Sequence, residues 1–235
     1  MTSIDAIIDR QISKWDADRK TSVKGEQRHP QPVPVVTVSG QSGSRGSYFA
    51  SRLAQKLDFQ RLKREVVNEI SRSADYRMRI VDLLDEQFRN KLDDLASSAL
   101  TGSPAGHSDD EYNLARIVLS IAHLGGIVLM GRGGSFIIGS QGGFHIRFVA
   151  PRERRIDNLV KYCEMSRAEA EDTVLKSDIS RREFISKLFD ANIDDPHHYD
   201  LVINSDYMDV EDILLLSTKA IEAKKNKLTY LDHDD

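Results

Sequence analysis

From residue 35 onward, short apolar runs alternate with longer segments in which apolar residues recur every three or four positions. The short runs predict four buried strands and a weaker fifth, at residues 35–38, 127–130, 145–149, 201–204 and 59–62. The periodic segments predict helices at residues 48–57, 64–73, 76–100, 110–124, 152–164, 167–176, 181–190 and 210–223. Buried strands that alternate with helices are typical of βαβ units, so the pattern predicts an α/β fold whose parallel sheet has helices on both faces.

The first 34 residues follow a different pattern. One face of a short helix over residues 1–19 would carry the apolar side chains, which are Ile4, Ile8, Ile12 and Trp15. Residues 19–34 are polar and hold three prolines, which indicates a linker. We expect the helix to pack on its own domain or on a partner, as a protein complex or a homo-oligomer. Its aspartates would be repelled by anionic lipid, which disfavours a membrane-surface helix.

Composition narrows the function classes. The 235 residues include 33 basic and 37 acidic side chains, and the resulting charge of −4 argues against a general nucleic-acid-binding protein. The single cysteine, Cys163, allows neither an internal disulfide nor a cysteine-based zinc site. No apolar run approaches the roughly 20 residues that span a bilayer, and the start lacks the order of a secretion signal. We therefore expect a soluble cytoplasmic protein that binds neither membranes nor nucleic acids.

A glycine- and serine-rich turn follows the first predicted strand, at residues 39–47. Backbone N–H groups in such a turn, with the positive end of the next helix, form a concavity that binds phosphate. In the pattern Gly-x-x-x-x-Gly-Lys-Ser/Thr, Gly40 matches the first position and Ser47 the last, where a hydroxyl would ligate Mg²⁺. Arg45 and Gly46 stand where glycine and lysine are expected. The alternative is an ordinary turn between a strand and a helix.

Further motifs follow in order along the chain. They are Thr37-Val38-Ser39 before the turn, Phe49–Ala54 after it, Ile127–Gly133, Phe148–Ile156, Met165–Ala170, Asp178–Arg181, Asp195-Pro196 and Tyr199–Asn204. Over roughly residues 35–220, in these motifs and their order, the chain resembles the cytidylate-kinase-like family of P-loop nucleoside monophosphate kinases.

The resemblance implies a P-loop kinase-like parallel sheet of about five strands, flanked by helices, with an arginine-bearing helical lid at about residues 152–192. The kinase-like domain would span residues 35–225, after the helix and linker of residues 1–34 and before a polar tail at 226–235. The implied reaction moves the γ-phosphoryl group of ATP to CMP or dCMP, with ATP and Mg²⁺ as donor and cofactor. Such transfer depends on positioning and on cations around developing charge, which suits arginine.

The resemblance also implies roles for single residues. Arg132 would hold the acceptor phosphate, Arg181 would approach the transferring phosphoryl group, and Arg45 would supply charge near the ATP phosphates, as catalytic residues. ATP binding is assigned to Gly40, Gly43, Ser44, Gly46, Ser47 and Arg155, with Ser47 as the Mg²⁺ ligand.

Each arginine has a structural alternative. Arg132 would then cap the following turn at the surface, Arg155 would belong to a solvated helical face, and Arg181 would pair with an acidic neighbour, namely Asp178, Asp194 or Asp195.

Two positions and one missing residue depart from the family's pattern, besides the exchange at 45 and 46. Lys63 stands where an acidic residue is expected, and Gly133 replaces a carboxylate that contacts cytosine. No strand supplies an obvious aspartate for Mg²⁺. The sequence therefore leaves three hypotheses open: a nucleoside monophosphate kinase, a kinase for another small acceptor, and a weakened or inactive nucleotide-binding regulatory module.

Overall fold

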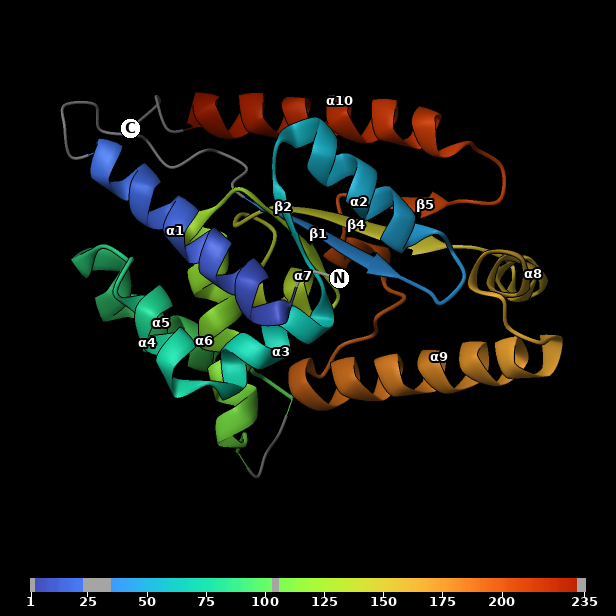
Figure 1. Ribbon diagram of the computed structural model, residues 1–235, viewed down its shortest axis with the longest axis horizontal. Coiled ribbons are helices and arrows are strands. Elements are labelled where there is room, and N and C mark those ends of the chain that lie inside the picture. The colour runs from blue at the N-terminus through green and yellow to red at the C-terminus, as the bar shows by residue number, and fades with distance from the viewer. Residues whose placement is uncertain (1–2, 23–34, 103–105, 232–235) are drawn as a thin grey trace.

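The computed structural model describes residues 3–22, 35–102 and 106–231 (Figure 1). Its centre is one sheet of five parallel strands in the order β2-β3-β1-β4-β5. The strands are β1 (Val35–Gly40), β2 (Gln60–Leu62), β3 (Ile127–Met130), β4 (Phe144–Val149) and β5 (Leu201–Asn204). The predicted α/β fold with a helix-flanked parallel sheet is confirmed, and the weak fifth run is a short edge strand.

Ten α-helices and one 3₁₀ turn surround this sheet in the described part of the chain. They are α1 (Ile4–Ser22), α2 (Gly46–Leu57), α3 (Arg64–Arg72), α4 (Ala74–Val81), α5 (Glu86–Ala99), α6 (Asp109–Leu124), α7 (Gly134–Ile138), α8 (Arg152–Cys163), α9 (Arg167–Phe189), η1 (Pro196–His198) and α10 (Val210–Leu231). No helix within the described ranges combines the length and the apolar character needed to cross a membrane.

Side chains of successive residues in β1 point to opposite faces of the sheet. Val36 and Val38 pack with α2 and α10, whereas Val35 packs with the helices of the opposite face. All three are completely buried. Because side chains along a strand alternate in direction, a strand covered on both sides reads as a continuous apolar run, which is the pattern that the sequence shows.

Helix α1 packs on its own domain. Its apolar side chains Ile8, Ile12 and Trp15 are buried in the cluster on the α3–α6 side, and the Trp15 indole donates a 3.0 Å hydrogen bond to the Gly125 carbonyl. The apolar face of α1, which the sequence analysis considered for a partner, is therefore covered by helices of this chain. Residues 23–34, most of the predicted linker, lie outside the described residues.

The predicted helix over residues 76–100 is wrong in its continuity. It is two helices, because the Asp85 carboxylate accepts a 2.8 Å hydrogen bond from the Phe88 amide and starts α5 anew. Conversely, the helices predicted at 167–176 and 181–190 are one helix, α9. Helix α10 continues to Leu231, past the predicted start of the tail at 226, and residues 232–235 lie outside the described part.

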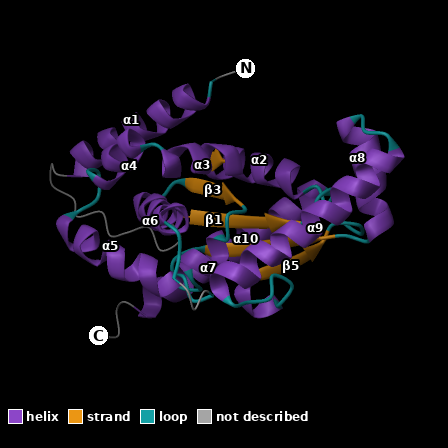
Figure 2. Cartoon of the chain, turned by 90° about the horizontal axis from the view of Figure 1, so that it is seen from below, coloured by secondary structure: helices purple, strands orange, loops and turns teal. Residues whose placement is uncertain are grey.

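Helices α8 and α9 enclose a small apolar cluster of their own. Ile156 and Leu159 of α8 pack with Ala170 and Val174 of α9, apart from the two clusters that flank the sheet. Figure 2 shows α8 and the adjoining end of α9 projecting beyond the carboxyl ends of the strands. This pair is the segment that the sequence predicted as a lid, and it overhangs the turn after β1.

Candidate active site

The turn after β1 is held from the neighbouring strand. The Gln41 amide donates to the Phe148 carbonyl at 3.1 Å, and the Gln41 side chain accepts from the Ala150 amide at 3.1 Å. Helix α2 begins at Gly46 with no side-chain cap. Its first amide groups therefore keep free donors beside the turn, which is the arrangement that binds phosphate at a helix N-terminus. We call residues 40–47 the phosphate loop.

The exchanged order of Arg45 and Gly46 has a packing reason. A Cβ atom at position 46 would lie 3.2 Å from Cβ of Phe148, so the close approach of α2 to β4 favours glycine there. The cation stands one position earlier, where Arg45 adopts a left-handed backbone with φ of 64°. Such a conformation costs on the order of 1 kcal/mol for a residue with a side chain. The loop thus keeps one cation and one glycine at the price of local strain.

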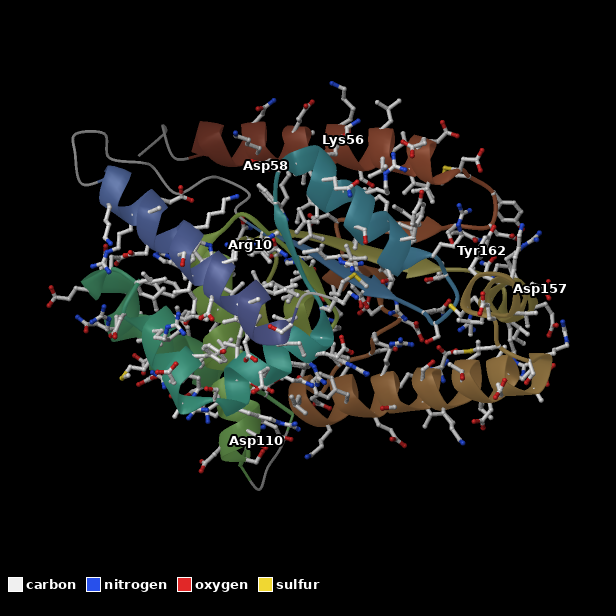
Figure 3. The ribbon with its side chains drawn as sticks, in the orientation of Figure 1. Arg10, Lys56, Asp58, Asp110, Asp157 and Tyr162 are labelled. Carbon is white, nitrogen blue, oxygen red and sulfur yellow. The ribbon has the colours of Figure 1, made fainter. Side chains whose placement is uncertain are left out.

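Two cavities meet at this loop. The first, which we call the loop cavity, has a volume of about 670 Å³ and lies between the loop and α8, with Tyr48, Asn158 and Tyr162 in its wall. Tyr162 projects from α8 at the end of the molecule toward which β1 runs (Figure 3). The second, the arginine cavity, has a volume of about 390 Å³ and lies between the loop, α3 and α9. Both cavities are lined by Gly40, Ser47, Met130 and Arg181.

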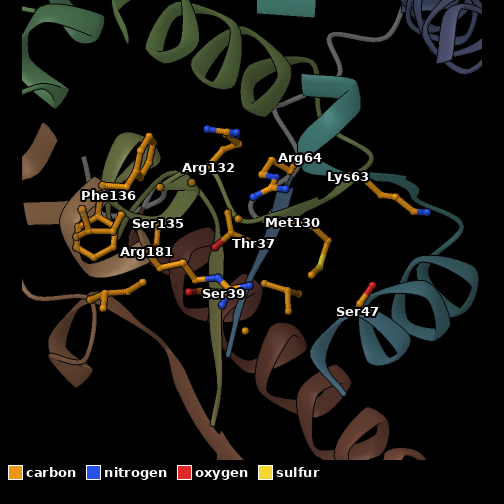
Figure 4. Close-up of a pocket in the computed structure, with 18 of the residues that line it drawn as sticks. Thr37, Ser39, Ser47, Lys63, Arg64, Met130, Arg132, Ser135, Phe136 and Arg181 are labelled. Atoms are coloured by element: carbon orange, nitrogen blue, oxygen red, sulfur yellow. The ribbon is translucent and has the colours of Figure 1, made fainter. Parts of the chain in front are cut away.

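Cations dominate the arginine cavity. Its charged lining residues are Lys63, Arg64, Arg132 and Arg181 against one acid, Glu65. Figure 4 shows Arg64 and Arg181 extending into this space from α3 and α9. The cavity therefore has a positive field that an anionic ligand would neutralise.

Arg132 follows β3 with a left-handed backbone of φ 59°, and its guanidinium lies 5.5 Å from the centre of the Phe184 ring. Burial lowers the pKa of Arg132, and the positive charges of Arg64 and Arg72 lower it further. Its Nε atom has no hydrogen-bond partner among the described residues. A guanidinium stays charged at neutral pH, so an anion beside this half-buried group would stabilise it. Among the described residues, no carboxylate pairs with Arg132.

Arg181 lies where the two cavities meet. One of its terminal nitrogens donates a 3.1 Å hydrogen bond to the Ser42 hydroxyl, while the other, Nη1, has no hydrogen-bond partner in the described part of the chain. The nearest carboxylate, Asp178, is 3.9 Å away. Burial lowers the pKa of Arg181, and Asp178 opposes this effect while Arg147 adds to it. Of the three acidic partners that the sequence suggested for Arg181, Asp178 therefore makes a contact, and it is a long one.

Arg155 lines neither cavity. It is almost completely buried, and one of its nitrogens donates to both oxygens of Asp178, at 3.1 and 2.9 Å. The solvated helical face proposed as the alternative for Arg155 is wrong. A Cβ atom on Gly43 would lie 2.2 Å from the Arg155 carbonyl oxygen, so α8 presses against the loop at this point. The structure thus places Arg155 behind the phosphate loop, as a support for it.

The other residues predicted to bind ATP differ in whether they line a cavity. Gly40, Gly43, Arg45, Gly46 and Ser47 line the loop cavity, whereas Ser44 is fully buried and lines neither cavity. The exposed Ser47 lies in the first turn of α2 and borders both cavities.

The protein offers few ligands for a metal ion. Among the described residues that line the two cavities, Glu65 is the single carboxylate, and no group of three or more acidic, histidine or cysteine side chains converges within the described ranges. This set fits Mg²⁺ that is carried by nucleotide phosphates and keeps several waters, with the Ser47 hydroxyl as a protein ligand. It does not fit a metal held by the protein alone.

The sequence analysis missed two arginines of this region. Arg64 lines the arginine cavity, and Arg147 lies buried on β4, where it donates to the Ser39 hydroxyl at 2.8 Å and pairs with Asp194 at 2.8 Å. The signal for Arg147 was present, since a charge within a strand predicted to be buried on both faces needs a partner. For Arg64, at the start of an amphipathic helix, the sequence carried no distinguishing signal.

Two known proteins match parts of this chain. A cytidylate kinase from Methanocaldococcus jannaschii is 26% identical over 122 residues, which are 51% of this chain and 68% of that protein. A uronate isomerase from Corynebacterium glutamicum is 30% identical over 130 residues, or 55% of this chain, but this chain spans only 25% of its length.

The fold has a solved counterpart. A crystal structure of an uncharacterized protein from Eubacterium ventriosum covers 82% of this chain and 99% of that one, with a TM-score of 0.64 and 16% identity. The model of the cytidylate kinase-like family matches residues 35–207, which begin at β1 and include the phosphate loop, Arg132 and all of α8 and α9. This chain therefore belongs to the cytidylate kinase-like family.

Proposed function

We propose that the chain is an ATP-dependent kinase that phosphorylates a nucleoside monophosphate, with CMP or dCMP as the first acceptors to test. One observation carries this proposal: Ser47 and Arg181 border both cavities. A donor bound along the loop and an acceptor bound among the arginines would present their phosphates to each other at that border. Positioning the two reactants in this way is a large part of how proteins catalyse phosphoryl transfer.

ATP is the proposed ligand of the loop cavity. The amides at the start of α2 and the Arg45 side chain would hold its phosphates, and the rings of Tyr48 and Tyr162 would flank its base. Mg²⁺ carried by the nucleotide would neutralise charge that develops on the β and γ phosphates. The Ser47 hydroxyl is the protein group placed to hold that ion.

The acceptor is proposed to bind in the arginine cavity. Arg132 has no anionic partner within hydrogen-bond reach among the described residues, and a phosphate there would give its guanidinium two oxygens to grip. Arg64 would add a second charge from the start of α3. The Arg181 guanidinium lies beside the space between the two phosphates, where the transferred group would pass.

A second candidate function rests on the scarcity of carboxylates. Because Glu65 is the single acid that lines either cavity in the described residues, an acidic group to orient Mg²⁺ is not in place beside the loop. A regulatory module that binds nucleotide without transferring phosphate would need no such group.

One assay separates these functions. Purified protein is incubated with Mg-ATP and each nucleoside monophosphate, and the nucleotides are separated by chromatography. ADP formed together with CDP or dCDP supports the kinase, and ADP with another product assigns another acceptor. A rise in melting temperature with ATP but no turnover supports the regulatory module. If millimolar nucleotide neither raises the melting temperature nor is turned over, both proposals fail.

Replacing Arg45 tests the donor side. We expect Arg45→Ala to weaken Mg-ATP binding about tenfold or more, because it removes a charged hydrogen-bond donor from the phosphates. Isothermal titration calorimetry measures the change. Arg52→Ala is the matched control, since Arg52 lies on α2, the helix that follows Arg45, but pairs with Glu211 at 2.8 Å and lines neither cavity. Equal affinity in Arg45→Ala and the native protein would refute the role of Arg45.

Replacing Arg132 tests the acceptor side. We expect Arg132→Met to raise the KM for the acceptor by roughly 10- to 100-fold through loss of a bidentate phosphate contact, with the KM for ATP unchanged. Steady-state kinetics with each substrate varied in turn measures both values. Arg72→Met, at the exposed end of α3 outside the cavity, is the control for loss of nearby charge. A rise in the KM for ATP instead would place the acceptor elsewhere.

A further inference from the structure

Helix α9 belongs to two separate apolar clusters. Near its start, Ala170 and Val174 pack with α8, whereas near its end Ile185, Leu188 and Phe189 are buried in the large cluster that flanks the sheet. The end is tied down further, because the Gly102 amide donates to the Leu188 carbonyl at 2.9 Å. A continuous helix anchored at its end to the main core cannot swing as a whole without opening that core.

The stretch of α9 between the two clusters carries the polar residues that reach the phosphate loop. Ser177 donates to the Ser42 hydroxyl at 2.8 Å, and Arg181 donates to the same hydroxyl oxygen at 3.1 Å. Helix α8 holds the next loop residue, since the Asn158 side-chain amide donates to the Gly43 carbonyl at 2.8 Å. Both helices therefore contact the phosphate loop, α9 through Ser42 and α8 through Gly43.

From these contacts we propose that Arg181 is preset on the phosphate loop before nucleotide binds, and that Ser42 is the positioning residue that holds it there. This inference rests on the proposed kinase function and deepens it. With Nη2 held by Ser42, the buried Nη1 atom has no hydrogen-bond partner among the described residues, and the Arg181 side chain lines both cavities. The alternative is an arginine that reaches the site only when the α8–α9 pair closes.

The charges around Arg181 explain why a neutral hydroxyl serves this purpose. Asp178 gives both of its oxygens to Arg155 and lies 3.9 Å from Arg181. A close carboxylate on Arg181 would neutralise it and compete with the phosphoryl oxygens, whereas a serine oxygen orients the guanidinium without adding negative charge to it. Preorganised charge of this kind costs no rearrangement at the moment of transfer.

Kinetics of Ser42 variants tests the proposal. We expect Ser42→Ala to lower kcat about tenfold with the KM for ATP and for the acceptor within about twofold, because the arginine is lost from its position but not from the site. Ser42→Thr keeps a hydroxyl and should restore the rate. Ser186→Ala is the control and should match the native protein, because Ser186 is an exposed serine on α9, the helix of Arg181, and lines neither cavity.

A second measurement does not depend on turnover. In the protein without nucleotide, NMR relaxation of the Arg181 Nε–H group, assigned by its loss in Arg181→Lys, should show a rigid side chain that becomes mobile in Ser42→Ala. If the group is already mobile in the native protein, or if kcat of Ser42→Ala is unchanged, the proposal is overturned. A higher KM for ATP at unchanged kcat would also overturn it, since Ser42 would then be a nucleotide ligand. Failure of the native protein to turn over any acceptor would reject the kinase alone, and the NMR result would still decide whether Arg181 is preset.

Discussion

Replacing Arg181 with methionine should reduce kcat on the order of 10³-fold, which is the lower range of the effect of an arginine on a transferring phosphoryl group. The expectation follows from its place at the border of both cavities and from its unpartnered Nη1 atom. Methionine replaces the aliphatic stem of arginine with an unbranched apolar chain of similar length, so the loss reports the guanidinium. Single-turnover kinetics with saturating Mg-ATP and acceptor measures the chemical step directly.

The neighbouring Arg182 supplies the matched control. It points about 100° away on the helix, is exposed, and makes a 3.5 Å contact with Asp194. Arg182→Met should change kcat by less than about threefold, because an exposed ion pair of this kind contributes roughly 0 to 1 kcal/mol. Equal losses in the two variants would show that Arg181 acts only through the general charge of α9. Lysine at position 181 should recover part of the rate, since it keeps the charge but not the fork of donors.

Replacing Asp178 with alanine should lower the free energy of unfolding by about 3 to 5 kcal/mol, which is the usual result of leaving one member of a buried ion pair alone. The side chains of Arg155 and Asp178 are 6% and 14% exposed. Alanine at position 178 would leave the buried Arg155 charge without its carboxylate, while its Nε still donates to the Ala150 carbonyl. Urea unfolding followed by circular dichroism measures the loss. Thermal unfolding should show a fall in Tm on the order of 10 °C.

Two further variants make the stability prediction specific. Asp172→Ala, on the same helix in an exposed pair with Lys176, should change the free energy of unfolding by less than about 1 kcal/mol. The double variant Arg155→Met with Asp178→Leu should recover most of the lost stability, because apolar residues of similar volume replace a buried pair at little net cost. If the double variant is as unstable as Asp178→Ala, the loss comes from packing of α8 on α9 and not from the stranded charge.

The strands of the sheet could be predicted because each short apolar run fits one structure, a strand buried on both faces. Val35, Val36 and Val38 are all buried, one toward one face and two toward the other, so the run could belong only to a strand covered on both sides. Helix continuity was less predictable. The break before α5 depends on whether Asp85 caps a new helix, and Leu84, directly before that cap, is buried. A local pattern of three- and four-residue steps is the same for one helix and for two in line.

Part of the site was also predictable. The phosphate loop follows from glycine and serine between a strand and a helix, and Arg132 from its place at the end of β3, because the carboxyl ends of parallel strands bind ligands. Arg155 shows the limit of this reasoning. Its sequence context is rich in arginine and glutamate and suggests an exposed face, yet it is the member of that group that α9 covers through Asp178.

The sequence by itself determined the fold, the order of its elements and the loop at the end of β1, because these depend on local hydrophobic period and on glycine, which act over a few residues. Only the tertiary structure decided which arginines share a cavity, since Arg64, Arg132 and Arg181 come from three elements far apart in the chain. It also decided that Arg155 pairs with Asp178 at 2.9 Å while Arg181 keeps only a 3.9 Å contact with the same carboxylate. One carboxylate, Asp178, lies between them, and the packing of α8 against α9 selects the arginine that receives it.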